Sequence, residues 1–336
     1  MRAGVVGAAI AAVVTAILVA GAGDQGGPNA FVVIGIGAGA SYGLVALGIV
    51  LVYKGTRVFN FAQGEFGTIA AFILYVLIEQ VKSPEIPYLV AAVLAIAGAV
   101  LIGLAMERLV IRPLLNAPRI TMLVATISFA LLSVGMQIML FLPEPKNLTP
   151  LIPTIDASGA PNGPEIFGYF VEPQRLLLIG VLIALAGMLG WFFSRTDLGL
   201  AVLATSQDEF ATRVVGIGVE RMSRFIWVSA AFLGALAGVL YVPLSGSLTP
   251  GVMTTGVLIP AFTGAVIGGM TSLPGAFVGG TVVGIVQSLA NWAANHYSLG
   301  GTRLQDIVPG FADFALFSVL LLVLLVRPQG LLGREA

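Results

Sequence analysis

The sequence predicts an all-α polytopic membrane protein with about eight to ten transmembrane segments, some of them broken or re-entrant. Three observations favour this class: 58% of the 336 residues are hydrophobic, only 10% are charged, and the uncharged runs are long. A soluble domain carries roughly 25% charged residues, so this chain has too few polar groups to cover a water-facing surface. Strand-type alternation is absent, which favours helices over a β-barrel.

Each predicted segment is a largely apolar run, and about 20 residues are needed to cross a bilayer. Runs without Asp, Glu, Lys or Arg cover residues 3–23, 25–53, 66–78, 86–106, 120–142 and 176–193. Prolines and glycines interrupt the long uncharged stretch 225–302, so we expect three segments there, at about 225–243, 252–270 and 275–294. A last segment at 310–326 makes ten. Residues 1–23 also resemble a secretory signal peptide, which leaves a retained helix and a cleaved signal both open.

We interpret residues 1–336 as a single transmembrane domain with two long loops, 143–173 and 194–224. With alternating segments, 12 of the 16 Lys and Arg residues fall on the side of the N-terminus. Basic residues mark the cytoplasmic side, so we expect both termini and loop 194–224 in the cytoplasm of a multi-pass plasma (cell inner) membrane protein. The proline-rich loop 143–173 is then extracytoplasmic, either as a solvated connector or as part of a docking face for a partner.

Several kinds of chemistry are not supported by the sequence. It contains no Cys and one His, and it lacks the G-x-x-x-x-G-K-[ST] phosphate-binding loop and the common hydrolase motifs. Lys+Arg and Asp+Glu are both 16, so no net charge attracts a nucleic acid. We therefore expect no catalytic residues, no metal, no cofactor and no nucleic-acid partner.

A first break in the helical pattern lies at residues 54–65, between two apolar runs. Its polar residues are Asn60, Gln63 and Glu65. Broken backbone at membrane depth is tolerated only inside protein or along a cavity, and transporters place polar substrates beside such breaks. These residues are therefore candidates for a translocation path. The alternative is that Asn60 and Glu65 only cap a helix at the cytoplasmic membrane surface.

A second break lies at residues 244–251, which end in a Pro-Gly pair and are followed by the hydroxyls of Thr254 and Thr255. We add both threonines to the candidate translocation path. The glycines that follow at four-residue spacing, Gly275 with Gly279 and Gly280 with Gly284, predict close helix packing.

The inner loop 194–224 has helical spacing of small and apolar residues over residues 201–215, with acids between them. Such a helix is too polar to span the membrane and too apolar to float free, so it should lie against something. Gly216 is placed to end it. The residues that we single out here are Gln207, Asp208, Glu209, Ala211, Arg213 and Gly216.

Four stretches, in order, resemble the permease subunits of ATP-binding-cassette importers for branched-chain amino acids. They are YGLVALGIVLVYKGTRVFNFAQGE at 42–65, QDEFATRVVGI at 207–217, FTGAVIGGMTSLPGAFVGG at 262–280 and RPQGLLG at 327–333. The second stretch stands where that family has its coupling segment. There are departures: Leu203 replaces a usual Arg, Phe210 a usual Glu, and residues 269–272 read GMTS in place of Gly-x-Gly-Ser.

The resemblance implies a permease that forms the translocation path for branched-chain or related amino acids and has no ATPase site of its own. It implies two ATPase subunits that bind at residues 207–216, a second identical or homologous permease subunit, an extracytoplasmic solute-binding protein and a surrounding lipid bilayer. The alternatives are an ion-coupled secondary transporter or channel for a small polar solute such as urea or an amide, and a membrane-embedded enzyme. The sequence does not choose the cargo.

Overall fold

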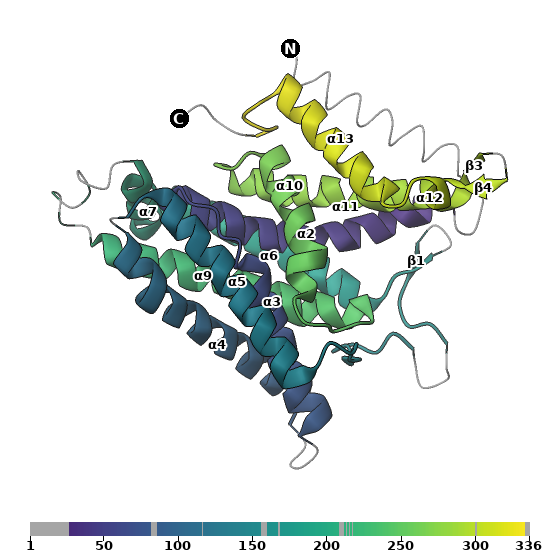
Figure 1. Cartoon of the computed structure of the whole chain (residues 1–336), viewed down its shortest axis with the longest axis horizontal. Coiled ribbons are helices and arrows are strands. Elements are labelled where there is room, and N and C mark those ends of the chain that lie inside the picture. The colour runs from purple at the N-terminus through teal and green to yellow at the C-terminus, as the bar shows by residue number, and fades with distance from the viewer. Residues whose placement is uncertain are drawn as a thin grey trace.

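A computed structural model describes residues 27–81, 86–115, 117–155, 160–166, 169–207, 212, 214, 216, 218–299 and 301–332 (Figure 1). The predicted first segment, residues 3–23, lies outside the described residues. In the first half the helices are α2 (Pro28–Thr56), α3 (Gln63–Tyr75), α4 (Tyr88–Met106) and α5 (Arg119–Phe141). Short π and 3₁₀ turns extend two of them, namely η1 (Val76–Gln80) after α3, and η2 (Glu107–Ile111) with η3 (Arg112–Leu114) after α4.

The second half is also helical. Its helices are α6 (Pro173–Arg195), α7 (Asp197–Gln207), α9 (Val219–Ser245), η4 (Thr254–Leu258), α10 (Ile259–Gly268), α11 (Leu273–His296), α12 (Leu304–Ile307) and α13 (Phe311–Val326). Two short antiparallel hairpins lie in connections between helices, β1 (Glu165–Ile166) with β2 (Tyr169–Phe170) and β3 (Ser298–Leu299) with β4 (Thr302–Arg303).

The predicted fold class is confirmed. Within the described ranges, six helices are long and apolar enough to cross a membrane, namely α2, α4 with its extension, α5, α6, α9 and α11. Two shorter apolar helices cover Thr254–Gly268 and Phe311–Val326, and α3 has only 13 residues before its π turn. The chain therefore combines full spans with short, interrupted segments, as the sequence predicts.

The stretch 225–302 divides into three segments as expected, with one difference at the first boundary. Helix α9 begins at Val219 and continues two residues beyond Pro243, where the sequence predicts its end. A proline removes only the hydrogen bond of its own N–H and crowds the turn before it, so the two residues after it can remain helical. Gly246, at φ +70°, then ends the helix in the left-handed conformation.

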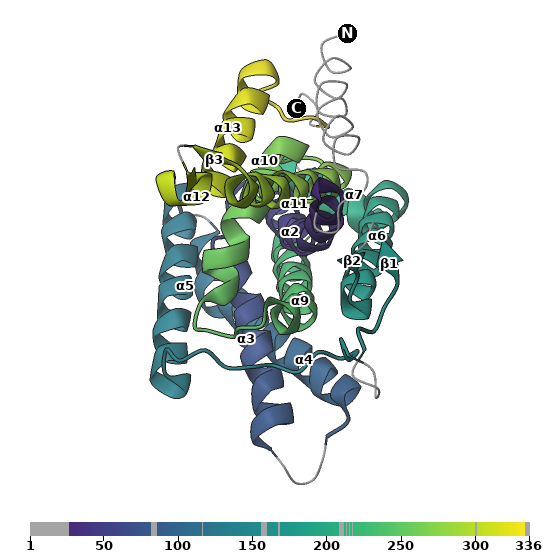
Figure 2. The same cartoon turned by 90° about the vertical axis from the view of Figure 1, so that its right-hand side faces the viewer.

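The centre of the fold is a close packing of α2, α10 and α11 through glycines, and both views show α2 beside α11 (Figures 1 and 2). A Cβ added at Gly284 would lie 2.3 Å from the backbone nitrogen of Gly39, and one at Gly264 would lie 2.8 Å from the Cα of Gly280. Backbones at this distance leave no room for a side chain. The packing predicted from the glycine spacing is confirmed.

The loop 143–173 is joined to the second break by backbone hydrogen bonds. The N–H of Lys146 donates to the carbonyl of Leu248 at 2.9 Å, and the N–H of Leu248 donates back at 2.8 Å. Leu148 and Val171 are buried against the body of the protein. The described part of the loop is therefore attached to the helices and is more than a solvated connector.

The glycine packing gives a first prediction. Gly280→Ala places a methyl group about 2.4 Å from the backbone of Gly43, so α2 and α11 must separate. We expect a loss of about 1–3 kcal/mol of stability, seen as a lower thermal unfolding midpoint of the detergent-solubilised protein. Gly187→Ala in α6 is the matched control, because nothing lies within 4 Å of its added Cβ. Equal midpoints for the two variants would contradict the packing argument.

Candidate functional site

The first break begins where α2 ends at a residue in the left-handed conformation. Arg57 has φ +57°, and its N–H donates to the carbonyl of Tyr53 at 2.8 Å. Left-handed backbone is uncommon for residues other than glycine and stops a helix. Phe59 then stacks on Tyr53 with ring centroids 5.0 Å apart and meets Phe262 of α10 edge-on. The chain therefore turns back inside an aromatic contact between α2 and α10.

Asn60 and Gln63 organise the start of α3. The side-chain oxygen of Asn60 accepts the N–H of Ala62 at 3.0 Å, and its amide nitrogen donates to Gln63 Oε1 at 3.1 Å. Gln63 Nε2 donates to the carbonyl of Ala230 in α9 at 2.8 Å. Asn60 therefore orders the turn before α3, whose N-cap residue Ala62 has no side-chain cap bond, and both Asn60 and Gln63 are buried within the protein.

Glu65 connects three parts of the fold, although its side chain has no solvent exposure. Its Oε1 accepts the hydroxyl of Thr254 at 2.6 Å, and its Oε2 accepts Gln137 Nε2 from α5 at 2.6 Å. Gln137 in turn accepts the backbone N–H of Gly251 at 2.9 Å and donates to Ser133 Oγ at 3.1 Å. The first break, the second break and α5 meet at this carboxylate.

The predicted path residues thus form two pairs and one outlier. Asn60 bonds Gln63, and Glu65 bonds Thr254. The hydroxyl of Thr255 instead donates to the carbonyl of Gly251 in its own turn, and its side chain is exposed. Glu65, Thr254, Gln137 and Ser133 form one hydrogen-bonded group, the Glu65 cluster, and Thr255 is not joined to it.

The electrostatics of Glu65 are unusual for a buried group. Within the described part of the chain, no Lys or Arg forms an ion pair or hydrogen bond with it. Burying a carboxylate is costly unless it is paired or hydrogen-bonded, and two neutral donors satisfy only part of its four acceptor sites. The arrangement can therefore accept a further donor, and a cationic one would bind most strongly.

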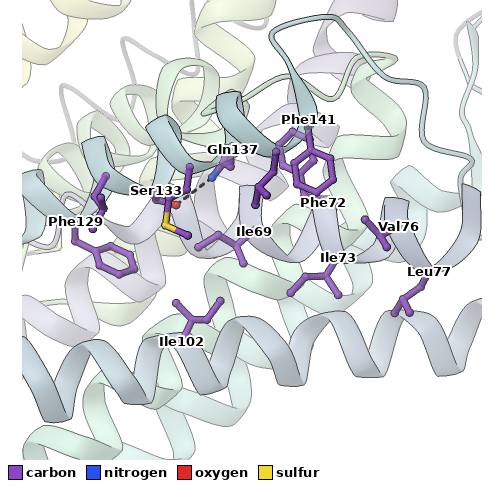
Figure 3. A pocket seen from close by; sticks show the side chains of 13 residues that line it. Ile69, Phe72, Ile73, Val76, Leu77, Ile102, Phe129, Ser133, Gln137 and Phe141 are labelled. Carbon is purple, nitrogen blue, oxygen red and sulfur yellow. Dashed lines mark hydrogen bonds between the residues drawn. The ribbon is translucent and has the colours of Figure 1, made fainter. Parts of the chain in front are cut away.

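An apolar cavity adjoins this cluster. Its volume is about 470 Å³, and it lies between α3, α4 and α5. Figure 3 shows Ile69 and Ile73 of α3, Ile102 of α4 and Phe129 of α5 around it. Ser133 and Gln137 are the polar residues of its lining, and Gln137 also bonds Glu65. The site thus places a buried carboxylate one side chain away from a space that suits an apolar group.

Helix α9 contacts the same site from behind. A Cβ at Gly234 would lie 2.8 Å from the carbonyl oxygen of Gln63, and one at Gly238 would lie 2.1 Å from that of Gly67. Together with the bond from Gln63 to the Ala230 carbonyl, this close approach ties α3 to α9. Any displacement of α9 along its axis must therefore move the start of α3.

The residues predicted at the inner loop are only partly described. Helix α7 begins at Asp197, earlier than the predicted start, and its described part ends at Gln207. Asp208, Glu209, Ala211 and Arg213 lie outside the described residues. Gly216 lies in a turn with φ +84°, a backbone conformation that suits glycine and the end of a helix.

Sequence reasoning missed Ser133 and Gln137. The signal was present, because the buried residues of α5 recur every three or four positions. They are Met122, Thr126, Ala130, Ser133 and Gln137. Three polar side chains on the buried stripe of an otherwise apolar span indicate a polar contact inside the protein. Which contact this was depended on the position of α5 relative to α3.

The fold and site define a multi-pass membrane permease, in which two interrupted helices meet at a buried acid. The sequence profile of the family described as "Branched-chain amino acid transport system / permease component" matches residues 31–326. The chain belongs to this family and is the permease component of a transport system rather than an enzyme. No solved structure matches the fold significantly.

Named relatives agree with this assignment. The high-affinity branched-chain amino acid transport system permease protein BraD of Pseudomonas aeruginosa is 30% identical over 309 residues, covering 89% of this chain and 94% of the relative. The corresponding protein LivH of Escherichia coli K12 is 30% identical over 316 residues with the same coverage. The ribose import permease protein RbsC of E. coli K12 is 27% identical over 204 residues, 58% of each chain.

The hydrogen bonds of Glu65 give a second prediction. Thr254→Val removes the donor to Oε1 and leaves that oxygen buried without its partner. We expect a loss of about 1–3 kcal/mol, measured as a lower thermal unfolding midpoint. Thr255→Val is the control at the adjacent position, and it should change the midpoint little because its hydroxyl bonds only its own turn. Equal stability of the two variants would show that the bond from Thr254 to Glu65 does not stabilise the fold.

Proposed function

We propose that this chain is the membrane-spanning subunit of an ATP-binding-cassette importer for branched-chain or related amino acids. Two findings support this cargo: the chain belongs to a family of transport permeases, and the relatives BraD and LivH are named as branched-chain amino acid permeases. The observation that supports a path at the two breaks is the buried Glu65, which has neutral donors and bonds Gln137, a residue of the wall of an apolar cavity.

The chemistry of a branched-chain amino acid suits this site. Its α-ammonium group is a cation that a carboxylate such as Glu65 can accept, and its aliphatic side chain favours an apolar space. Ser133 and Gln137 lie between the two environments, because both line the cavity and Gln137 bonds Glu65. A ribose permease among the relatives means that family membership alone does not fix the cargo.

The importer class requires partners that supply energy and cargo. We propose two ATPase subunits, a second permease subunit that is identical or homologous, and an extracytoplasmic solute-binding protein, all assembled at the cell inner membrane. The basic-residue bias supports cytoplasmic termini and a cytoplasmic loop 194–224. The loop 143–173, which is attached to the second break through Lys146 and Leu248, then faces the binding protein.

The path hypothesis gives a third prediction. Glu65→Gln keeps the shape of the side chain but removes its charge, so uptake of radiolabelled leucine into proteoliposomes of the whole complex should fall at least about tenfold. Asn60→Ala should lower uptake less, because Asn60 acts through the start of α3. The ATPase should still co-purify with both variants.

The control is Thr255→Val, outside the cluster. Wild-type uptake in Glu65→Gln would remove Glu65 from the path and leave a structural role. If no ATPase co-purifies even with the wild type, an ion-coupled carrier or channel replaces the importer proposal.

We further propose that residues 207–217 are the main ATPase contact. The described helix α7 packs on α6, where a Cβ at Gly199 would lie 2.4 Å from the Phe192 carbonyl oxygen. It also contacts α2 and α9. Since α9 touches Gln63, an ATPase that moves this segment can displace the start of α3.

The coupling proposal gives a fourth prediction. Ala211→Trp places a bulky side chain in a segment of small side chains, which should block close approach of the ATPase. The variant permease should insert and fold, but either the ATPase no longer binds or the complex hydrolyses ATP without uptake. Co-purification and the ratio of hydrolysis to uptake measure this. Normal transport with the ATPase retained would assign coupling to another part of the chain.

The proposed orientation gives a fifth prediction. Because the chain has no native Cys, single cysteines placed at Ser206 and at Ser158 should react with a membrane-impermeant thiol reagent from opposite sides of the membrane. Labelling of both from the same side would contradict the proposed orientation.

A further inference from the structure

A second cavity, of about 220 Å³, lies where the ends of four helices meet. It is lined by the end of α2, the connection before α5 and the first turn of α5, and also by Thr205 of α7 and the first two turns of α9. Its lining is mostly polar, unlike that of the cavity beside Glu65. This cavity is separate from the Glu65 cluster, none of whose residues lines it.

Two arginines line this cavity, Arg57 and Arg119. Among the residues that the structure describes, neither guanidinium has a hydrogen-bond or ion-pair partner. Other arginines of the fold do: Arg112 pairs with Glu220, and Arg175 pairs with Glu172. Arg57 also keeps its left-handed φ of +57°, which costs of order 1 kcal/mol for a residue with a Cβ.

The other polar groups of the cavity offer few donors. The hydroxyl protons of Thr56 and Thr205 are donated to the carbonyls of Val52 and Ala201 in their own helices. The hydroxyl of Ser223 is donated to Glu107, a fully buried carboxylate that does not line the cavity. Among the described side chains that line the cavity, the donors that remain available are therefore the two guanidiniums.

We propose that this cavity binds an anionic phosphate group between Arg57 and Arg119. Guanidinium groups match phosphate oxygens with paired, charge-assisted hydrogen bonds. The group can belong to the headgroup of an anionic lipid or to free phosphate. Ile120, next to Arg119, is 70% exposed on the outer face of α5, so the cavity lies beside a surface that meets lipid. Bound phosphate would hold the end of α2 and the starts of α5 and α9 together, beside the end of α7.

The test uses the full-length permease in detergent after removal of bound lipid. Three titrations are made separately: with phosphatidylglycerol, with the zwitterionic phosphatidylcholine, and with inorganic phosphate compared with chloride at equal ionic strength. Each records the thermal unfolding midpoint of the protein, and native mass spectrometry records which lipids stay bound. We expect phosphatidylglycerol to raise the midpoint by several degrees more than phosphatidylcholine. Arg57→Gln and Arg119→Gln should each weaken this binding by about tenfold or more.

Arg108→Gln is the matched control, because Arg108 is exposed, as Arg119 is, but lies on the neighbouring turn η2 and does not line the cavity. A shift with phosphatidylglycerol alone identifies a lipid headgroup, and a shift with inorganic phosphate identifies a free anion; both support the site when they depend on Arg57 and Arg119. The proposal is overturned if the wild type shows no preference for either anion, or if Arg108→Gln weakens binding as much. It is also overturned if the arginine variants lose only the ATPase, since the cavity then receives an acidic protein partner.

Discussion

A break in a membrane helix leaves backbone N–H groups that no water can satisfy, and in this protein side chains satisfy many of them. At the first break, the amides of Ala62 and Phe61 donate to Asn60 and Thr126. At the second break, the amides of Gly251 and Met253 donate to Gln137 and Thr68. Helix α5 supplies Thr126 to the first break and Gln137 to the second, and α3, which follows the first break, supplies Thr68 to the second, so the two breaks depend on the same helices. Glu65, bonded to both Gln137 and Thr254, is the point where they join.

This mutual dependence explains how α5 is held. Most of its side chains face outward, and large apolar residues such as Leu131, Met139 and Leu140 are exposed. Lipid tails are as apolar as these side chains, so little hydrophobic force drives α5 onto its neighbours. Hydrogen bonds from Thr126 and Gln137 supply a directional attachment instead. Helices α2, α10 and α11 are held together differently: their glycine backbones are in close contact, and the attraction comes from dispersion.

These two kinds of packing divide the molecule into a closely packed, rigid centre and a periphery that a few polar contacts attach to it. Helix α9 belongs to both, since it packs closely on α3 at Gly234 and Gly238 and begins at Val219, within the loop predicted at 194–224. A permease needs a route from its energy input to its cargo path that does not deform the rigid centre. The contact of α9 with Gln63 offers such a route, while the arginine-lined cavity at the ends of α2, α5 and α9 offers a place where a bound anion can restrain it.

The sequence by itself determined the class, most boundaries of the segments that the structure describes and the two breaks, because apolar length, proline and glycine act locally. It also determined the glycine packing, since four-residue spacing places small residues on one helix face. It indicated Asn60, Gln63, Glu65 and Thr254 without saying which would bond to which, and it did not separate Thr254 from Thr255. Only the tertiary structure brought Gln137 and Ser133 to Glu65 and placed Arg57 and Arg119 in the wall of one cavity. The members of these pairs lie 62 to 72 positions apart in the chain, and their proximity depends on the docking of α5, which no local pattern encodes.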